Sequence, residues 1–175
     1  MARSDERRSV CSEPRESNPA RIHFCVIDAE SVDVQAEIAA VAQQVVAPLG
    51  LRGFTKMLRE AEVAGEIRGR MRAMARGCLP EENPPALSLV VSQPDLFELR
   101  WKLAGAKNSL VRAYHGEPGH PDVVVVRIHR KETDLPVAKQ RELQNAVMEE
   151  GQRRFVAGEQ CQWGHTRACS HCLDP

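Results

Sequence analysis

A run of four valines leads directly into a cluster of basic residues in the stretch "DVVVVRIHRKETDLP", residues 122–136. Valine runs are typical of strands inside a sheet, whereas clustered cations belong in water. Because side chains alternate along a strand, Arg127, His129 and Lys131 share one side, and the other side ends in a further arginine, Arg130. The stretch therefore predicts either a strand with an ordinary solvated end or a strand that presents cations to a phosphate group.

Two neighbouring segments carry further basic side chains. The segment "LFELRWKL" places Arg100 and Lys102 opposite its apolar row, and "SLVRAYHG" carries Arg112 on the same row as Tyr114. If both segments pair in order with the valine strand, basic side chains can converge on the open side of one antiparallel sheet. The converging residues would be Arg100, Arg112, Arg127, His129 and Lys131.

Such a cluster has two interpretations. Arginine and lysine neutralise phosphate, and an imidazole can exchange a proton near neutral pH, so the cluster suits binding or cleavage of RNA. An antiparallel sheet also commonly has one solvated face, on which basic side chains are ordinary. The pattern alone favours the solvated face.

The stretch "CQWGHTRACSHC" combines thiols and imidazoles at close spacing. Thiolate and imidazole suit tetrahedral Zn²⁺, and four protein ligands leave no open position, so a bound zinc would be structural rather than catalytic. The same residues can also be unliganded, and their spacing matches no standard zinc finger. The candidate ligands are Cys161, His165, Cys169 and Cys172, with His171 as an alternative.

Periodicity assigns these residues to elements of an α+β fold. The strands and helices largely segregate along the chain, which favours α+β over a doubly wound fold. We expect a small antiparallel sheet, made of one N-terminal strand and a three-stranded meander, packed with two N-terminal helices and one C-terminal helix. The proline-rich segment 79–95 predicts a loop. The predicted strands are 21–27, 96–103, 109–116 and 122–130, and the predicted helices are 31–50, 51–78 and 135–156.

Composition limits the class of protein. The chain has 175 residues, of which 42% are hydrophobic, and its 24 basic and 24 acidic residues cancel. This balance argues against a generally cationic nucleic-acid coat but allows a local basic face. No apolar run approaches the ~20 residues of a membrane span, and no leader opens the chain, so we expect a cytoplasmic protein with reduced thiols. The expected organisation is a disordered tail over 1–20, a domain over 21–157 and a Cys/His-rich tail over 158–175.

The second half of the chain resembles the RelE/HigB/ParE-like toxin superfamily, in the branch that includes phage-derived HigB-type proteins. The resemblance covers residues 96–157, and the strand and helices before them agree in order and kind. It rests on a Glu-Leu-Arg strand, an arginine before an aromatic residue, a hydrophobic strand that runs into basic residues, and a last helix with an alanine and a terminal arginine. These features fall on Glu98-Leu99-Arg100, Arg112 with Tyr114, His129-Arg130-Lys131, Thr133 and Pro136, and Ala146 with Arg153 or Arg154.

The resemblance implies the toxin of a type II toxin–antitoxin system. Such a toxin cleaves mRNA, usually on the ribosome, and is neutralised by an antitoxin, here expected to be a helix-turn-helix protein. The reaction needs no metal, because the ribose 2′-OH attacks the adjacent phosphorus while a base, an acid and cations assist. We expect His129 to be the base or the acid, and Arg100, Arg112 and Lys131 to stabilise the charged phosphorane. Further RNA-binding candidates are Arg127, Arg130, Tyr114 and Lys102.

Two alternatives to the nuclease remain open from the sequence. The ParE-like branch shares the fold but inhibits DNA gyrase, so the fold alone does not determine the activity. A second alternative is a non-catalytic binding module of the same fold, which would use the zinc tail to hold protein or nucleic acid.

Overall fold

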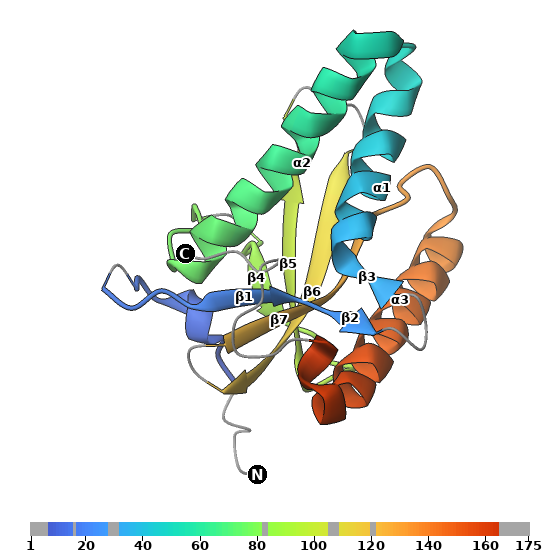
Figure 1. Ribbon diagram of the computed structural model, residues 1–175. Helices are drawn as coiled ribbons and strands as arrows, with labels where there is room; N and C mark the ends of the chain where they lie inside the picture. Colours follow the sequence, from blue (N-terminus) through green and yellow to red (C-terminus); the bar gives the residue numbers. More distant parts are fainter. Residues whose placement is uncertain are drawn as a thin grey trace.

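The computed structural model describes residues 7–15, 17–27, 32–81, 84–104, 109–119 and 122–164. Its element order is a strand region, two helices, a meander and a last helix (Figure 1). No helix among these residues has the length and apolar character needed to cross a membrane. The helices are α1 (Val34–Val46), α2 (Gly53–Ala75) and α3 (Val137–Gly158), and the strands are β1 (Arg21–Phe24), β2 (Val26–Ile27), β3 (Val32–Asp33), β4 (Leu87–Leu89), β5 (Leu96–Lys102), β6 (Leu110–Gly119) and β7 (Asp122–Arg130).

Five strands form one mixed sheet in the order β1-β7-β6-β5-β4. Strands β5, β6 and β7 pair antiparallel, as the meander predicts, and the α+β class is confirmed. The prediction of a purely antiparallel sheet is wrong, because β1 pairs parallel with β7 and places Ile22 opposite Val123. The long crossover through α1 and α2 separates β1 from the meander, and such a connection permits parallel pairing. The segment predicted as a loop also contains β4, which pairs Leu87 with Leu99 of β5.

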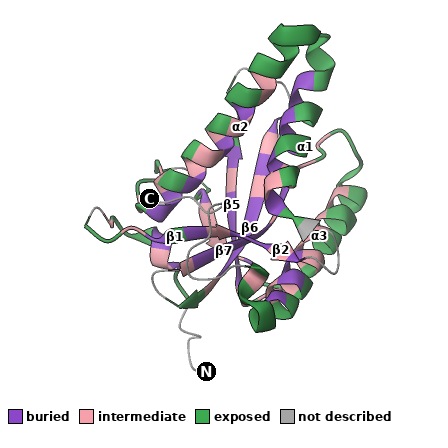
Figure 2. Cartoon of the chain, viewed as in Figure 1, coloured by how far each residue is buried: buried purple, intermediate pink, exposed green. Residues whose placement is uncertain are grey.

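Strand β7 lies inside the sheet, between β1 and β6, and this position explains its valine run. Val123, Val124, Val125 and Val126 are at most 1% exposed, so both faces of this half of the strand are covered. Figure 2 shows the same concentration of buried residues in the middle of the sheet. Because β1 pairs only with residues 122–125, the basic second half of β7 extends beyond its neighbour.

The helices pack on the sheet to different extents. Helices α1 and α2 lie side by side in front of β5 and β6 in Figure 1, and α3 contacts β7 and β6. Asp33 caps α1, since its Oδ1 accepts the backbone N–H of Gln35 at 2.8 Å. In α3 the buried residues are Gly151, Arg154 and Gly158, all in its second half. The first half of α3 is therefore not packed into the core, which leaves room beside β7.

The N-terminal segment packs against the domain along residues 7–15 and 17–20, which differs from the expected disordered tail. Cys11 is 2% exposed, and Ser9 donates its hydroxyl proton to the Glu117 carboxylate. The backbone N–H of Arg15 donates to the carbonyl of Arg76 at 2.8 Å. Sequence composition missed this segment because polar contacts, rather than apolar side chains, attach most of it.

A close contact between Gly116 and Phe155 joins α3 to β6. A Cβ added to Gly116 would lie 2.1 Å from the Cε2 atom of Phe155. We therefore expect Gly116→Ala to lower the free energy of unfolding by about 1–3 kcal/mol, measured by urea denaturation. Gly65→Ala is the control, because no atom lies within 4 Å of that position and the helix should gain about 0.5–1 kcal/mol. Equal effects of the two substitutions would contradict the contact.

Candidate functional site

Three residues of the predicted cluster form one row across three strands. Arg100 of β5 lies opposite Arg112 of β6, and Arg112 lies opposite His129 of β7. Directly opposed side chains in adjacent strands point to the same face with Cβ atoms about 4.5–5.5 Å apart. Lys131 follows on the same side, and its backbone N–H donates to the carbonyl of Leu110 at 2.7 Å. The convergence expected from side-chain alternation is present for these four residues.

A carboxylate, Glu98, lies beside the row. It forms an ion pair with Arg112, and the same Oε1 accepts the hydroxyl proton of Tyr114 at 3.2 Å. Glu98 and Tyr114 are both buried. Burial, with the negative charge of Glu98, raises the pKa of Tyr114, so its phenol stays protonated. Tyr114 therefore lies next to the row on the same face of the sheet, and its side chain is buried rather than exposed.

His129 is held as a neutral imidazole. Its ring stacks on Tyr114 with centroids 5.8 Å apart, and its Nδ1 lies 3.2 Å from the carbonyl oxygen of Arg130. A carbonyl oxygen only accepts, so this contact places the proton on Nδ1 and a lone pair on Nε2. Nε2 is shielded from solvent and has no hydrogen-bond partner among the described residues. Burial, with the charges of Arg127 and Arg112, lowers the pKa of His129 to about 4. A neutral imidazole with a free lone pair is suited to accept a proton.

The low pKa of His129 predicts a dependence of stability on pH. The pKa is about 4 in the folded protein and about 6.5 when the imidazole is exposed, so the unfolded chain binds the proton more tightly. The contribution of His129 to stability should therefore be constant above pH 6.5 and fall between pH 6.5 and 4, by up to about 3 kcal/mol. Urea denaturation at pH 7 and pH 4.5 measures the loss, and His129→Gln should reduce it. An unchanged loss in that variant would show that other groups cause it.

The other basic residues on this face differ in their exposure and in their contacts with the rest of the chain. Lys131 is partly exposed; burial and Arg112 lower its pKa, Arg100 adds to this effect, and Glu98 opposes it. Arg100 uses its Nε to donate to the carbonyl of Pro85 at 2.9 Å. The exposed Lys102 ends β5 at the edge of this face, opposite a leucine of β6.

Arg127 and Arg130 are engaged in ion pairs away from the row. Arg127 pairs with Glu37 of α1, and Arg130, on the other side of β7, pairs with Glu132 at 3.1 Å. Glu37 also pairs with the buried Arg154 of α3 at 2.7 Å and accepts the backbone N–H of Ile128 at 2.8 Å. The two arginines predicted to bind RNA are therefore neutralised by carboxylates of this chain.

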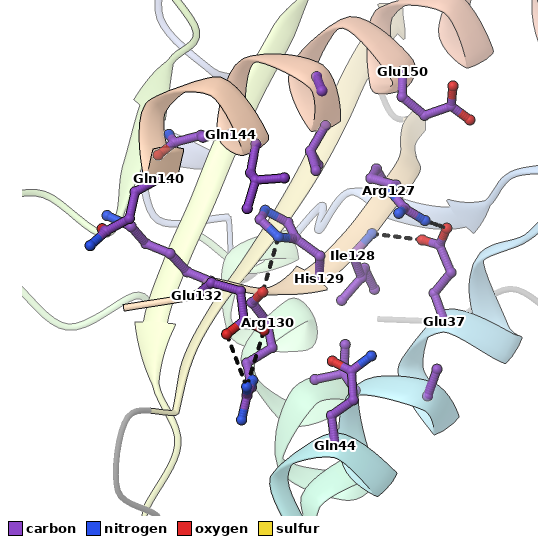
Figure 3. Close-up of a pocket in the computed structure, with 16 residues that line it drawn as sticks. Glu37, Gln44, Arg127, Ile128, His129, Arg130, Glu132, Gln140, Gln144 and Glu150 are labelled. Carbon is purple, nitrogen blue, oxygen red and sulfur yellow. Dashed lines mark hydrogen bonds and ion pairs between the residues drawn. The ribbon is translucent and has the colours of Figure 1, made fainter. Parts of the chain in front are cut away.

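A pocket of about 490 Å³ opens between α1, the end of β7 and the first half of α3 (Figure 3). It lies next to the row, since both His129 and Lys131 line it. Sequence reasoning named Ala146 but did not bring together the other helical residues of the walls, because on a single sequence they are ordinary positions of two helices. The lining residues are Glu37, Ala40, Val41, Gln44, Arg127, Ile128, His129, Arg130, Lys131, Glu132, Gln140, Leu143, Gln144, Ala146, Val147 and Glu150.

The face that carries the row is partly covered, whereas the sequence predicts an open face. A Cβ added to Gly151 of α3 would lie 3.7 Å from Cβ of Tyr114 and 3.3 Å from Leu96. Helix α3 therefore lies directly on the Tyr114 end of this face, and the pocket begins where the helix separates from the sheet. The sequence predicts α3 but not which part of the sheet it covers.

The predicted zinc ligands cannot be assembled from the described residues. Cys161 is exposed, and the other three candidates, His165, Cys169 and Cys172, lie outside the described residues. Over residues 7–164, where the structure describes them, no group of three or more His, Cys, Asp and Glu side chains could hold a metal ion. Comparisons of the chain with protein-family models, curated proteins and solved structures find no match.

Proposed function

We propose that this chain is a RelE/HigB-like toxin that cleaves mRNA without a metal cofactor. The observation that carries the proposal is the adjacent register of Arg100, Arg112 and His129 on three neighbouring strands, with Lys131 next to them. Cations and a neutral imidazole on one rigid sheet match the needs of phosphodiester transfer. The order of strand, two helices, meander and helix is consistent with the RelE-like arrangement.

The reaction begins with attack of a ribose 2′-oxygen on the adjacent phosphorus. His129 Nε2 accepts the 2′ proton, because its lone pair has no partner among the described residues and the ring is unprotonated near neutral pH. Arg100 and Arg112 stabilise the added negative charge of the phosphorane. The bond from phosphorus to the 5′-oxygen then breaks, and this oxygen takes a proton from the Lys131 ammonium group, whose pKa is lowered. The products are a 2′,3′-cyclic phosphate and a 5′-hydroxyl.

Catalysis in this scheme requires a local movement. Nε2 of His129 is shielded from solvent, although His129 lines the pocket between β7 and the first half of α3. The first half of α3 has no buried residue, so a shift of this half costs little buried surface. We infer that RNA entry moves the imidazole or this part of α3.

The proposal includes the partners of such a toxin. The substrate is mRNA in the ribosome, and the inhibitor is a helix-turn-helix antitoxin, both in the cytoplasm. The simplest test adds the purified chain to a cell-free translation system. We expect protein synthesis to stop and mRNA fragments with 5′-hydroxyl ends to accumulate. Intact mRNA at a stoichiometric excess of protein over ribosomes would contradict the nuclease.

A non-catalytic binding module is the second candidate, and the ion pairs favour it. Glu98 neutralises Arg112, and Glu37 neutralises Arg127, so fewer free cations face a phosphate than the sequence predicts. Such a module would bind gyrase, as ParE-like proteins do, or another macromolecule with the help of a zinc-bound tail. Intact mRNA together with stoichiometric zinc that Cys169→Ser removes would support the zinc-bound form.

A further inference from the structure

The pocket beside the row has a floor and two walls of different chemistry (Figure 3). The end of β7 forms the floor, and Ile128 stands there between Arg127 and His129 along the strand. Helix α1 supplies Gln44 on one side, and α3 supplies Gln144 on the other. At about 490 Å³ the pocket is within the ~300–1,000 Å³ range of small-molecule sites.

The charges that line the pocket cancel. Its three carboxylates, Glu37, Glu132 and Glu150, each pair with an arginine, and two of those arginines, Arg127 and Arg130, also line it. Lys131 makes no ion pair among the described residues and lies at the side nearest the row, since its backbone N–H donates to the carbonyl of Leu110 in β6. The interior therefore suits a neutral ligand, whereas an anion belongs at the Lys131 side.

The uncharged groups of the pocket suit both the polar edge and the flat face of a nucleobase. Gln44 and Gln144 have no hydrogen-bond partner among the described residues, and a primary amide offers both a donor and an acceptor to the edge of a base. Gln140 donates from Nε2 to the carbonyl oxygens of Thr133 and Leu135, at 3.1 and 2.7 Å, and keeps its own oxygen as an acceptor. The apolar lining can contact the flat face of a ring and comprises Ala40, Val41, Ile128, Leu143, Ala146 and Val147.

We propose that this pocket binds one unstacked nucleobase of an RNA strand whose neighbouring phosphate lies at Lys131. The inference rests on the proposed function, because it assigns the substrate of the same site. Single-stranded RNA is commonly recognised in this way, by bases that leave the stack and bond through their edges. The pocket then selects where the strand is cut, and the row of cations performs the cut.

The test measures binding separately from cleavage. The probe is a 2′-fluoro RNA hexamer, which lacks the attacking hydroxyl, and a set of hexamers in which each base in turn is removed. We expect removal of one base to weaken binding to the full chain about tenfold. Gln144→Ala and Ala146→Trp should each weaken binding of the intact hexamer to a similar extent. In these variants, removal of that one base should cause no further loss of binding. Ala146 is exposed on α3, so a larger side chain there fills the pocket without entering the core.

Matched controls and contrary outcomes are available within the same helices. Asn145→Ala and Gln43→Ala remove exposed amides that do not line the pocket, and both should bind like the wild type. An equal loss of binding on base removal at all six positions would contradict base binding in the pocket, and so would unchanged binding by both pocket variants. Neither result would bear on the proposed nuclease activity. Tight binding of a free mononucleotide in place of the hexamer would overturn the RNA assignment. Base-dependent binding without mRNA cleavage would contradict the proposed nuclease activity but support base binding in the pocket.

Discussion

His129→Ala is expected to lower the rate of mRNA cleavage by about 10²- to 10⁴-fold, the usual contribution of a general base. The imidazole is the one group of the row that is both neutral and supplied with a free lone pair. Since its pKa is about 4, the imidazole is in its unprotonated form at every pH above about 5. The rate should therefore fall on the acid side near pH 4 and not near the ordinary histidine value of about 6.5. Initial rates with a short RNA substrate, measured from pH 4 to 8, give both quantities.

A second histidine provides the control for this substitution. His23 lies on β1 and contacts Asp122 at 2.8 Å, away from the row. His23→Ala should cleave RNA at the wild-type rate once circular dichroism shows that the variant is folded. A His129→Ala variant that is folded and retains the full rate would exclude His129 as the base.

Glu37→Ala is expected to destabilise the fold by about 3–5 kcal/mol, the usual effect of removing one partner from a buried ion pair. Its carboxylate bonds Arg127, the buried Arg154 and the backbone N–H of Ile128, and its side chain is only 14% exposed. Without it, the charge of Arg154 stays buried with Glu150 as its remaining acidic partner. The strand edge at Ile128 also loses its acceptor. Urea denaturation at pH 7 measures the change.

Another ion pair of α3 gives the matched control. Glu142 pairs with Lys139 at 2.8 Å, but its side chain is 68% exposed. Exposed pairs contribute about 0–1 kcal/mol, so Glu142→Ala should change stability little. Glu37→Gln should recover part of the loss, because an amide oxygen can still accept from Ile128. A Glu37→Ala variant as stable as Glu142→Ala would show that the cluster does not join α1, β7 and α3.

The row could be predicted from the sequence because it depends on local rules. Side chains alternate along a strand, and short turns between consecutive strands favour antiparallel pairing in order. These rules place Arg100, Arg112 and His129 on one face, and the register confirms it. The valines are buried because β7 lies inside the sheet. The only sequence signal for this position is that the valines form a continuous run.

The state of the charges could not be predicted because it depends on distant partners. Glu37 is 90 residues from Arg127 and appears in the sequence as one of many acidic residues on a helix. Glu98 could be placed on the polar row, but its pairing with Arg112 depends on the exact register. The parallel pairing of β1 also lacks a local signal, since it depends on the path of two helices. These long-range contacts decide which arginines remain free for a phosphate.

Mapping of mRNA ends in a cell-free translation system tests the central claim most directly. The wild-type chain should generate fragments with 5′-hydroxyl and 2′,3′-cyclic phosphate ends, and the double variant Arg112→Ala/His129→Ala should generate none above background. A third sample with Arg72→Ala, an exposed arginine of α2, should match the wild type. Full activity of the double variant, or fragments with 5′-phosphate ends, would contradict the assignment of the site.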